Sequence, residues 1–169
     1  MKMSEAIRER RSIRKYKPNI EIPQEDIDLM LKAAMMAPSA MTMYPWEFVV
    51  VRSKEIREQM ISVHPDCYMI KDASLAIVVC GRPELQNALS SGFWPQDCGA
   101  ATENILLQAV ELGYGTCWCG EYPFSKRITG LQQVLDVTSI PFSVIAVGVP
   151  DENPKARGYY EKEKVKYLK

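Results

Sequence analysis

The sequence has no surplus of charge and no long apolar segment. Its 21 basic and 21 acidic residues cancel, so the chain offers no broad field that would steer it onto nucleic acid or an anionic membrane. No apolar run approaches the roughly 18–20 residues that a membrane helix needs. The N-terminus opens on polar residues instead of the apolar core of a signal peptide. These absences predict a soluble, cytoplasmic protein.

The histidine and the cysteines are not arranged in the patterns that metal sites and disulfide scaffolds need. The only histidine, His64, lies beside Pro65 in a polar stretch, where we expect a surface turn. The five cysteines are an odd number without repeated spacings, which favours a reducing compartment over disulfides. Cys117 and Cys119 form a C-x-C pair, but a second pair is missing and His64 is far away in sequence. Because zinc usually takes four ligands, the sequence predicts no metal site.

Three common catalytic motifs are also missing. No G-x-G-x-x-G follows an expected strand, and the segment from Gly115 to Gly120 lacks the Lys and Ser/Thr that end a phosphate-binding P-loop. The G-x-S-x-G motif of serine hydrolases is absent as well. The common nucleotide-binding folds, ATP chemistry and serine-dependent hydrolysis are therefore disfavoured.

What the chain does contain is the composition of one compact domain, with 47% hydrophobic and 25% charged residues over 169 positions. Apolar spacings of three and four predict a helix after Pro23 that ends before Pro38. Apolar or small residues nearly all round predict a buried helix over 97–112. Further helices are expected over 1–10, 53–61 and 125–135, and strands over 48–51, 75–80, 116–119 and 142–149. This alternation indicates an α/β or α+β sheet with helices on both faces.

A basic stretch after the first expected helix is a candidate anion site. In an extended chain Arg10, Ser12 and Arg14 point the same way, and in a helix Arg10 and Arg14 share a face. A guanidinium group binds two phosphate oxygens at once, and a serine hydroxyl can fill a remaining acceptor. A solvated charge run at a helix end has the same composition. Taken alone, the stretch leaves both interpretations open.

Five segments occur in an order typical of a known family. They are R-R-S-I-R-K-Y at 10–16, A-P-S-A at 37–40 with P-W-E-F at 45–48, K-D-A-S at 71–74, the 97–112 helix with its continuation to Gly120, and V-G-V-P at 147–150. In this combination the chain resembles a short member of the nitroreductase family over nearly its whole length. The resemblance implies an α+β flavoprotein fold with a central, mostly antiparallel sheet flanked by helices.

The resemblance also implies an intertwined homodimer with two FMN sites at its interface. Residues 1–169 would form a single FMN-binding domain, with 151–169 as a polar tail that contacts the partner subunit. The implied cofactor-binding residues are Arg10, Arg11, Ser12, Arg14, Pro38, Ser39, Ala40, Thr42, Gly120, Glu121 and Arg157.

The implied roles of these residues differ. Arg10 and Ser12 would hold the phosphate, with Arg157 as a further cation, and Arg14 would lie near N1 and O2 of the flavin. The 38–40 segment would reach the FMN bound mainly by the other subunit. Backbone N–H groups of Gly120 and its neighbour Glu121 would lie near N5 and O4.

The chain departs from the family pattern between A-P-S-A and P-W. Thr42 and Tyr44 stand where family members commonly carry Asn and Gln. Thr42 can still donate one hydrogen bond, whereas Tyr44 puts a ring in place of an amide. The substrate preference is therefore open.

The implied function is that of an oxidoreductase in which FMN carries the chemistry and no side chain is needed as an acid or base. Hydride would come from NADH or NADPH, and a nitroaromatic, quinone or similar acceptor would then be reduced in a ping-pong reaction. Two alternatives remain from the sequence: a family relative with dehalogenase or dehydrogenase activity, and a flavin-binding regulator or storage protein without turnover.

Overall fold

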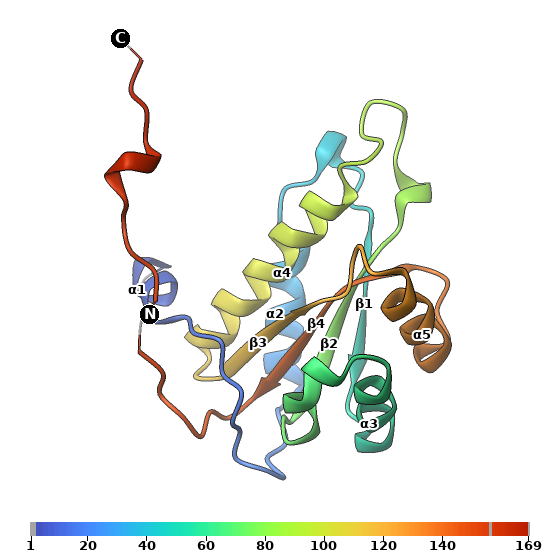
Figure 1. Ribbon diagram of the computed structural model, residues 1–169, viewed down its shortest axis with the longest axis vertical. Coiled ribbons are helices and arrows are strands. Elements are labelled where there is room, and N and C mark those ends of the chain that lie inside the picture. The colour runs from blue at the N-terminus through green and yellow to red at the C-terminus, as the bar shows by residue number, and fades with distance from the viewer. Residues whose placement is uncertain (1–2, 156, 169) are drawn as a thin grey trace.

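The computed structural model describes residues 3–155 and 157–168. Its helices are α1 (Met3–Glu9), α2 (Gln24–Met35), α3 (Lys54–Val63), α4 (Trp94–Glu111) and α5 (Ser125–Leu135). Its strands are β1 (Trp46–Val51), β2 (Leu75–Gly81), β3 (Gly115–Gly120) and β4 (Ile140–Gly148). The strands form one four-stranded sheet in the order β1-β2-β4-β3, and every neighbouring pair is antiparallel (Figure 1). The α+β class and the antiparallel sheet are therefore confirmed.

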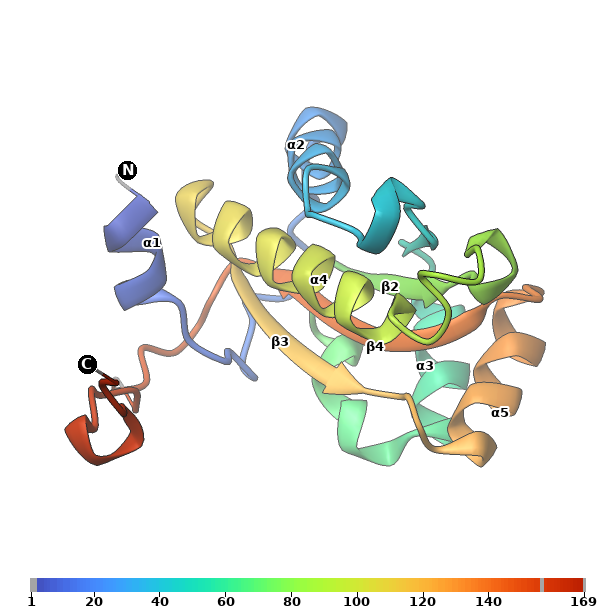
Figure 2. The ribbon, with the colours of Figure 1, turned by 90° about the horizontal axis from the view of Figure 1, so that it is seen from above.

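The sheet lies between two layers of helices, with α2 and α4 on one face and α3 and α5 on the other (Figure 2). Every residue of the central strand β2 is buried. Because side chains alternate along a strand, Val78 joins the core on the side of α3 and α5, whereas Ile77 and Val79 join the core under α2 and α4. The fold thus has a separate apolar core on each face of the sheet.

The helix α4 is buried along one side and half-buried along the other. Cys98, Ala101 and Ile105 are fully buried against the sheet, while Gly99 and Ala100 remain partly accessible. The helix begins three residues before the predicted start because Pro95 fits its first turn. The apolar residues on the accessible side leave a surface that a further structural element can cover.

Both ends of the chain lie on the same side of the molecule, apart from the sheet (Figure 2). The short helix α1 packs against α4, and the tail extends past it with Tyr159 and Tyr160 exposed. Within the described range 157–168, the hydrogen bonds of the tail connect only its own residues. Among the described residues, no helix has the length and apolar character to span a membrane.

The predicted surface position of His64 is wrong. The side chain is buried where α3 meets the 3-10 helix η2 (Pro65–Lys71). Its Nδ1 atom lies 2.8 Å from Oε1 of Glu121, a carboxylate that is 57 residues away in sequence. The polar neighbours of His64 indicated a loop correctly, but local composition does not show which distant residue covers that loop.

Candidate functional site

The basic stretch forms an extended segment that is fixed to the edge of the sheet. The N–H of Ile13 donates to the carbonyl of Thr116 on β3 at 2.8 Å, and the Tyr16 hydroxyl donates to the carbonyl of Ile13 at 2.6 Å. Ile13 and Tyr16 are both buried. Because successive side chains of an extended chain point to opposite sides, burial of Ile13 turns Ser12 and Arg14 away from the core.

We expect Gly115→Ala to disturb this attachment. A Cβ at Gly115 would lie 2.8 Å from Cγ1 and 2.9 Å from Cβ of Ile13, and the latter atom cannot move without the backbone. Overpacking of this kind costs about 1–3 kcal/mol of unfolding free energy. Gly120→Ala on the same strand is the control, because a Cβ there meets no atom within 4 Å. Urea unfolding of both variants measures the difference, and equal losses would contradict the contact.

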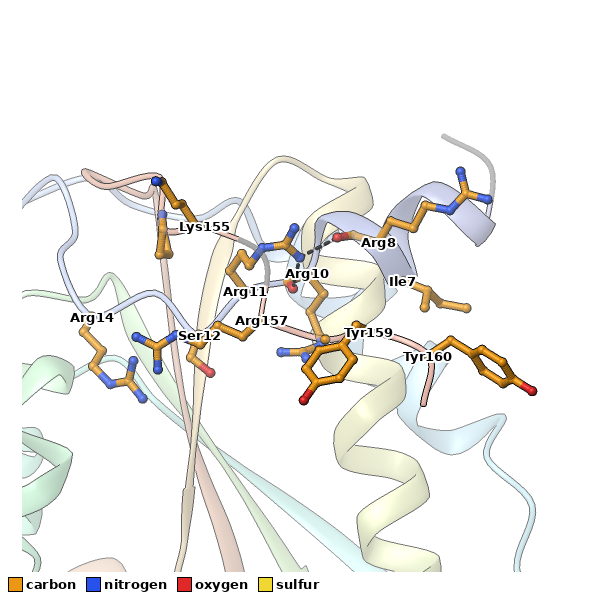
Figure 3. Close-up of a pocket in the computed structure, with 12 residues that line it drawn as sticks. Ile7, Arg8, Arg10, Arg11, Ser12, Arg14, Lys155, Arg157, Tyr159 and Tyr160 are labelled. Atoms are coloured by element: carbon orange, nitrogen blue, oxygen red, sulfur yellow. Dashed lines mark hydrogen bonds between the residues drawn. The ribbon is translucent and has the colours of Figure 1, made fainter. Parts of the chain in front are cut away.

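A cavity of about 830 Å³ opens beside this segment (Figure 3). It is lined by α1, by residues that follow α1, and by the start of the tail. The cations in its lining are Arg8, Arg10, Arg11, Arg14, Lys155 and Arg157, and no described residue that lines it is acidic. A concave surface with charges of one sign concentrates the field, so the cavity is suited to a phosphorylated anion.

The cavity brings together Arg10, Arg11, Ser12, Arg14 and Arg157, which are the predicted cofactor-binding residues from the two ends of the chain. Figure 3 shows Arg14, Ser12 and Arg10 along the segment, and Arg157 on the tail. The other predicted residues, Pro38, Ser39, Ala40, Thr42, Gly120 and Glu121, do not line this cavity.

Sequence reasoning missed Arg8 and Lys155 as cavity residues. Lys155 is two positions from Arg157, and Arg8 lies in the last turn of α1. Each of them lies two positions before a predicted cation, and this proximity in the sequence is the signal that could have identified them.

The cations of the cavity differ in how far they are already engaged. The guanidinium of Arg11 donates to the carbonyls of Arg8 and Arg10 and thereby caps the end of α1. Arg10 Nε lies 3.4 Å from Glu103 Oε1, and both side chains are partly accessible. Within the described residues, no carboxylate forms an ion pair with the guanidinium of Arg14. A ligand of Arg14 therefore competes with no described carboxylate, whereas a ligand of Arg10 competes with the partly accessible Glu103.

The A-P-S-A loop lies at the opposite end of α4 from this cavity. The N–H of Ala40 donates to Oδ1 of Asp97 at 3.0 Å, in the first turn of α4. The hydroxyl of Ser39 accepts from the N–H of Tyr44 at 2.9 Å. Positive φ angles occur at Met41, Thr42 and Tyr44, at 53°, 55° and 49°. This backbone is uncommon for residues with side chains, so the loop has a specific shape that its hydrogen bonds hold in place.

Asp97→Asn is expected to stabilise the protein at neutral pH. Burial raises the pKa of Asp97, and among the described residues its Oδ2 has no hydrogen-bond partner. An acid with a raised pKa in the folded state binds its proton more tightly there than in the unfolded chain. Its contribution to stability therefore falls as pH rises from the ordinary Asp pKa through the folded-state value. Asn still accepts from the N–H of Ala40 but carries no charge.

The expected gain at neutral pH is about 1 kcal/mol of unfolding free energy. Because the wild-type carboxyl becomes protonated in acid, the gain should shrink as pH falls toward the ordinary Asp range. Urea unfolding of wild type and Asp97→Asn at neutral and acidic pH measures it. A difference that does not change with pH would contradict the role given to the buried charge.

Gly120 ends β3 and Glu121 follows it, and the two residues differ in exposure. Gly120 is exposed, and its missing side chain leaves the backbone open, because a Cβ there would meet no atom within 4 Å. Glu121 is fully buried, and its N–H donates to the carbonyl of Phe142 at 3.0 Å. Of the two N–H groups that the resemblance assigns to the flavin, that of Glu121 is thus bonded to the sheet. Gly120 offers the bare surface on which a planar ring can lie.

The strand β3 connects this surface to the cavity. Ser12 pairs with Thr116 near the start of β3, and Gly120 follows four residues later at its end. At a strand rise of about 3.3 Å per residue, the two points are roughly 13 Å apart. The cationic cavity and the exposed backbone of Gly120 thus lie at the two ends of one strand.

The antiparallel sheet, its helical layers and the cationic cavity agree with the family that the sequence motifs indicated. Residues 7–82 and 62–149 match the model of the nitroreductase family, and the chain belongs to this family.

A relative from Methanothermobacter thermautotrophicus, named provisionally as an NADH dehydrogenase/NAD(P)H nitroreductase, is 46% identical over 98% of this chain and 86% of its own length. A crystal structure from Parabacteroides distasonis with the same provisional name has a TM-score of 0.91 and 34% identity, covering 98% of this chain and 96% of the other. An FMN-dependent nitroreductase from Clostridium difficile has a TM-score of 0.87 and 31% identity, covering 97% of this chain and 98% of the other.

Proposed function

We propose that the chain is an FMN-dependent oxidoreductase that accepts a hydride from NADH or NADPH and then reduces a nitroaromatic, a quinone or a similar acceptor. The observation that carries this proposal is the cavity in which Arg10, Ser12, Arg14 and Arg157 meet. The names of the relatives, which include NAD(P)H nitroreductase and FMN-dependent nitroreductase, support it.

The residues of the cavity fit the phosphate of FMN. Two arginines and a serine hydroxyl provide the charge-assisted and neutral donors that a phosphate accepts. The exposed backbone at Gly120, at the far end of β3, fits the ring because no Cβ blocks the approach of a flat surface. FMN, when bound, supplies the hydride chemistry, and the protein supplies binding, orientation and charge.

Arg14 is the residue to which we assign control of the electron affinity of the cofactor. It lies two positions beyond Ser12 on the extended segment, a displacement of roughly 6–7 Å. Its guanidinium has no carboxylate partner among the described residues. A positive charge beside the N1 and O2 edge of the ring stabilises the negative charge that reduction places there.

We also propose that the site is completed by a second copy of the chain. The A-P-S-A loop and the cavity lie at opposite ends of α4, so the loop of one subunit would reach the cofactor held mainly by the other. The half-buried side of α4, the exposed Ile7 of α1 and the apolar residues of the tail provide surface for such a partner. The tail, over 151–169, would then pack on the partner subunit.

Steady-state kinetics test the proposed reaction. A ping-pong sequence predicts parallel lines in double-reciprocal plots when the nicotinamide is varied at several fixed concentrations of a nitroaromatic or a quinone. Turnover that requires both substrates to be bound together gives intersecting lines and contradicts the sequence. A panel of halogenated and reduced heterocyclic compounds, assayed in parallel, separates this activity from dehalogenase and dehydrogenase activity.

A further inference from the structure

A second cluster of reactive side chains lies at the end of β3, inside the core and outside the cationic cavity. His64 follows α3, Cys67 lies in η2, and Glu121 follows β3. Their exposed fractions are 4%, 1% and 0%. His64 Nδ1 lies 2.8 Å from Glu121 Oε1 and 3.0 Å from Cys67 Sγ, and Cys67 Sγ lies 3.6 Å from the same oxygen. A nitrogen, a sulfur and an oxygen thus converge at one buried point.

Hydrogen bonds within the cluster do not satisfy all of its polar atoms. A ring nitrogen carries either a proton or a lone pair, so Nδ1 of His64 cannot donate to Glu121 and also accept from Cys67. If Nδ1 and the thiol both donate, they share Oε1 of Glu121. The second oxygen, Oε2, is buried and has no hydrogen-bond partner among the described residues. Burial of an unpaired polar atom is unfavourable, so the cluster offers an unused ligand atom directed into the core.

We propose that His64, Cys67 and Glu121 form a zinc-binding site. Imidazole nitrogen, thiolate sulfur and carboxylate oxygen are the ligand types that zinc takes in proteins. A neutral imidazole, a thiolate and a carboxylate carry two negative charges, which the Zn²⁺ ion neutralises. The site therefore leaves no net charge among the buried ligands, and three protein ligands leave one position of a four-coordinate ion open.

The spacing of the donor atoms suits a tetrahedral ion after a small adjustment. Bond lengths of about 2.0–2.3 Å place the ligand atoms of a tetrahedral zinc site roughly 3.3–3.6 Å apart. The separation of Cys67 Sγ and Glu121 Oε1, at 3.6 Å, already fits. The two distances from His64 Nδ1 have to open by about 0.5 Å to reach the tetrahedral separation.

The second nitrogen of His64 faces a carboxylate that lies beyond hydrogen-bond distance. Nε2 lies 3.7 Å from Oδ2 of Asp66, which in turn lies 3.5 Å from Nη2 of Arg127. Charge attraction to this carboxylate favours a proton on Nε2. The lone pair is then on Nδ1, which faces the cluster.

Zinc binding to the full-length, flavin-loaded protein tests this site directly. The protein is kept reduced, stripped of metal with a chelator and titrated with Zn²⁺ in competition with a chromophoric chelator. We expect one Zn²⁺ per chain and, for Cys67→Ala, an affinity at least about 100-fold weaker. Cys98→Ala is the matched control, since this thiol is also fully buried but lies in the other core. It should bind zinc like the wild type.

Two further measurements do not depend on the folding of Cys67→Ala. The carboxyl of Asp66 is 85% exposed, so Asp66→Asn should fold normally and bind zinc about 10-fold more weakly. Wild type loaded with Co²⁺ should show thiolate-to-cobalt charge transfer and the long-wavelength bands of a tetrahedral site. A wild-type protein that binds no stoichiometric zinc, or a Cys67→Ala protein that binds it equally tightly, overturns the proposal.

Discussion

Arg10→Gln is expected to release FMN, whereas Arg14→Gln is expected to retain FMN and lower its reduction potential. Arg10 lines the cavity, and its contact with Glu103 is at the partly accessible rim, so its guanidinium is available to a phosphate. A hydrogen bond to a charged group contributes about 1.5–3 kcal/mol, so its loss should weaken FMN binding by roughly 10–100-fold. Ultrafiltration and flavin fluorescence measure the affinity.

Arg14 should behave differently because we place its charge beside the ring and not beside the phosphate. Loss of that charge removes a favourable interaction with the reduced cofactor. For a two-electron couple about 30 mV corresponds to 1.4 kcal/mol, and we expect a decrease of roughly 30–60 mV. FMN affinity should fall by less than about tenfold, which corresponds to 1.4 kcal/mol of binding free energy. Potentiometry on flavin-saturated protein measures the shift.

Lys15→Gln is the control for both variants. Lys15 is the exposed neighbour of Arg14 and does not line the cavity, so its loss should change neither the FMN affinity nor the potential. If Arg14→Gln leaves the potential unchanged while the FMN affinity collapses, Arg14 is a phosphate ligand and the assigned division of roles is wrong.

Removal of residues 159–169 is expected to convert the proposed dimer to a monomer that loses FMN. The tail carries Tyr159, Tyr160, Tyr167 and Leu168, which are 79%, 71%, 75% and 83% exposed in the single chain. Burial of a large apolar side chain contributes about 1.5–3 kcal/mol, so a partner that covers several of them gains a large stabilisation. This truncation keeps Arg157 and its charge.

Sedimentation velocity at micromolar concentration measures the expected change, with absorbance of the bound flavin as a second signal. Arg157→Gln in the full-length chain is the control, because it removes a cavity cation and keeps the tail. We expect it to remain a dimer with weakened FMN binding. A wild-type protein that sediments as a flavin-loaded monomer would exclude the shared site, and a truncated protein that stays dimeric would exclude the role of the tail.

The secondary structure could be predicted well because its signals are local. The helix predicted after Pro23 is α2, and the apolar segment of 75–80 is the fully buried strand β2. α4 begins three residues before the predicted position 97, because Pro95 fits the first turn although Trp94 and Pro95 follow a polar loop. The start of α4 depends on one proline, whereas the helix itself depends on the small and apolar residues along its whole length.

The candidate site could be predicted in part, and the limit has a physical reason. The stretch around Arg10 and Arg14 is short and contiguous, so its chemistry is visible in the sequence. The contact between His64 and Glu121 joins residues 57 positions apart, and in the sequence His64 is also far from the C-x-C pair of Cys117 and Cys119. The fold brings His64 to the residue two positions beyond that pair, which no local pattern indicates.

The most direct test of the central proposal is an anaerobic titration of the FMN-loaded protein with NADH and with NADPH. We predict that one equivalent of at least one of the two bleaches the flavin absorbance completely, and that a nitroaromatic or a quinone added afterwards restores it. Flavin that stays tightly bound and oxidised in the presence of both nicotinamides would contradict the account and indicate a flavin-binding regulator or storage protein.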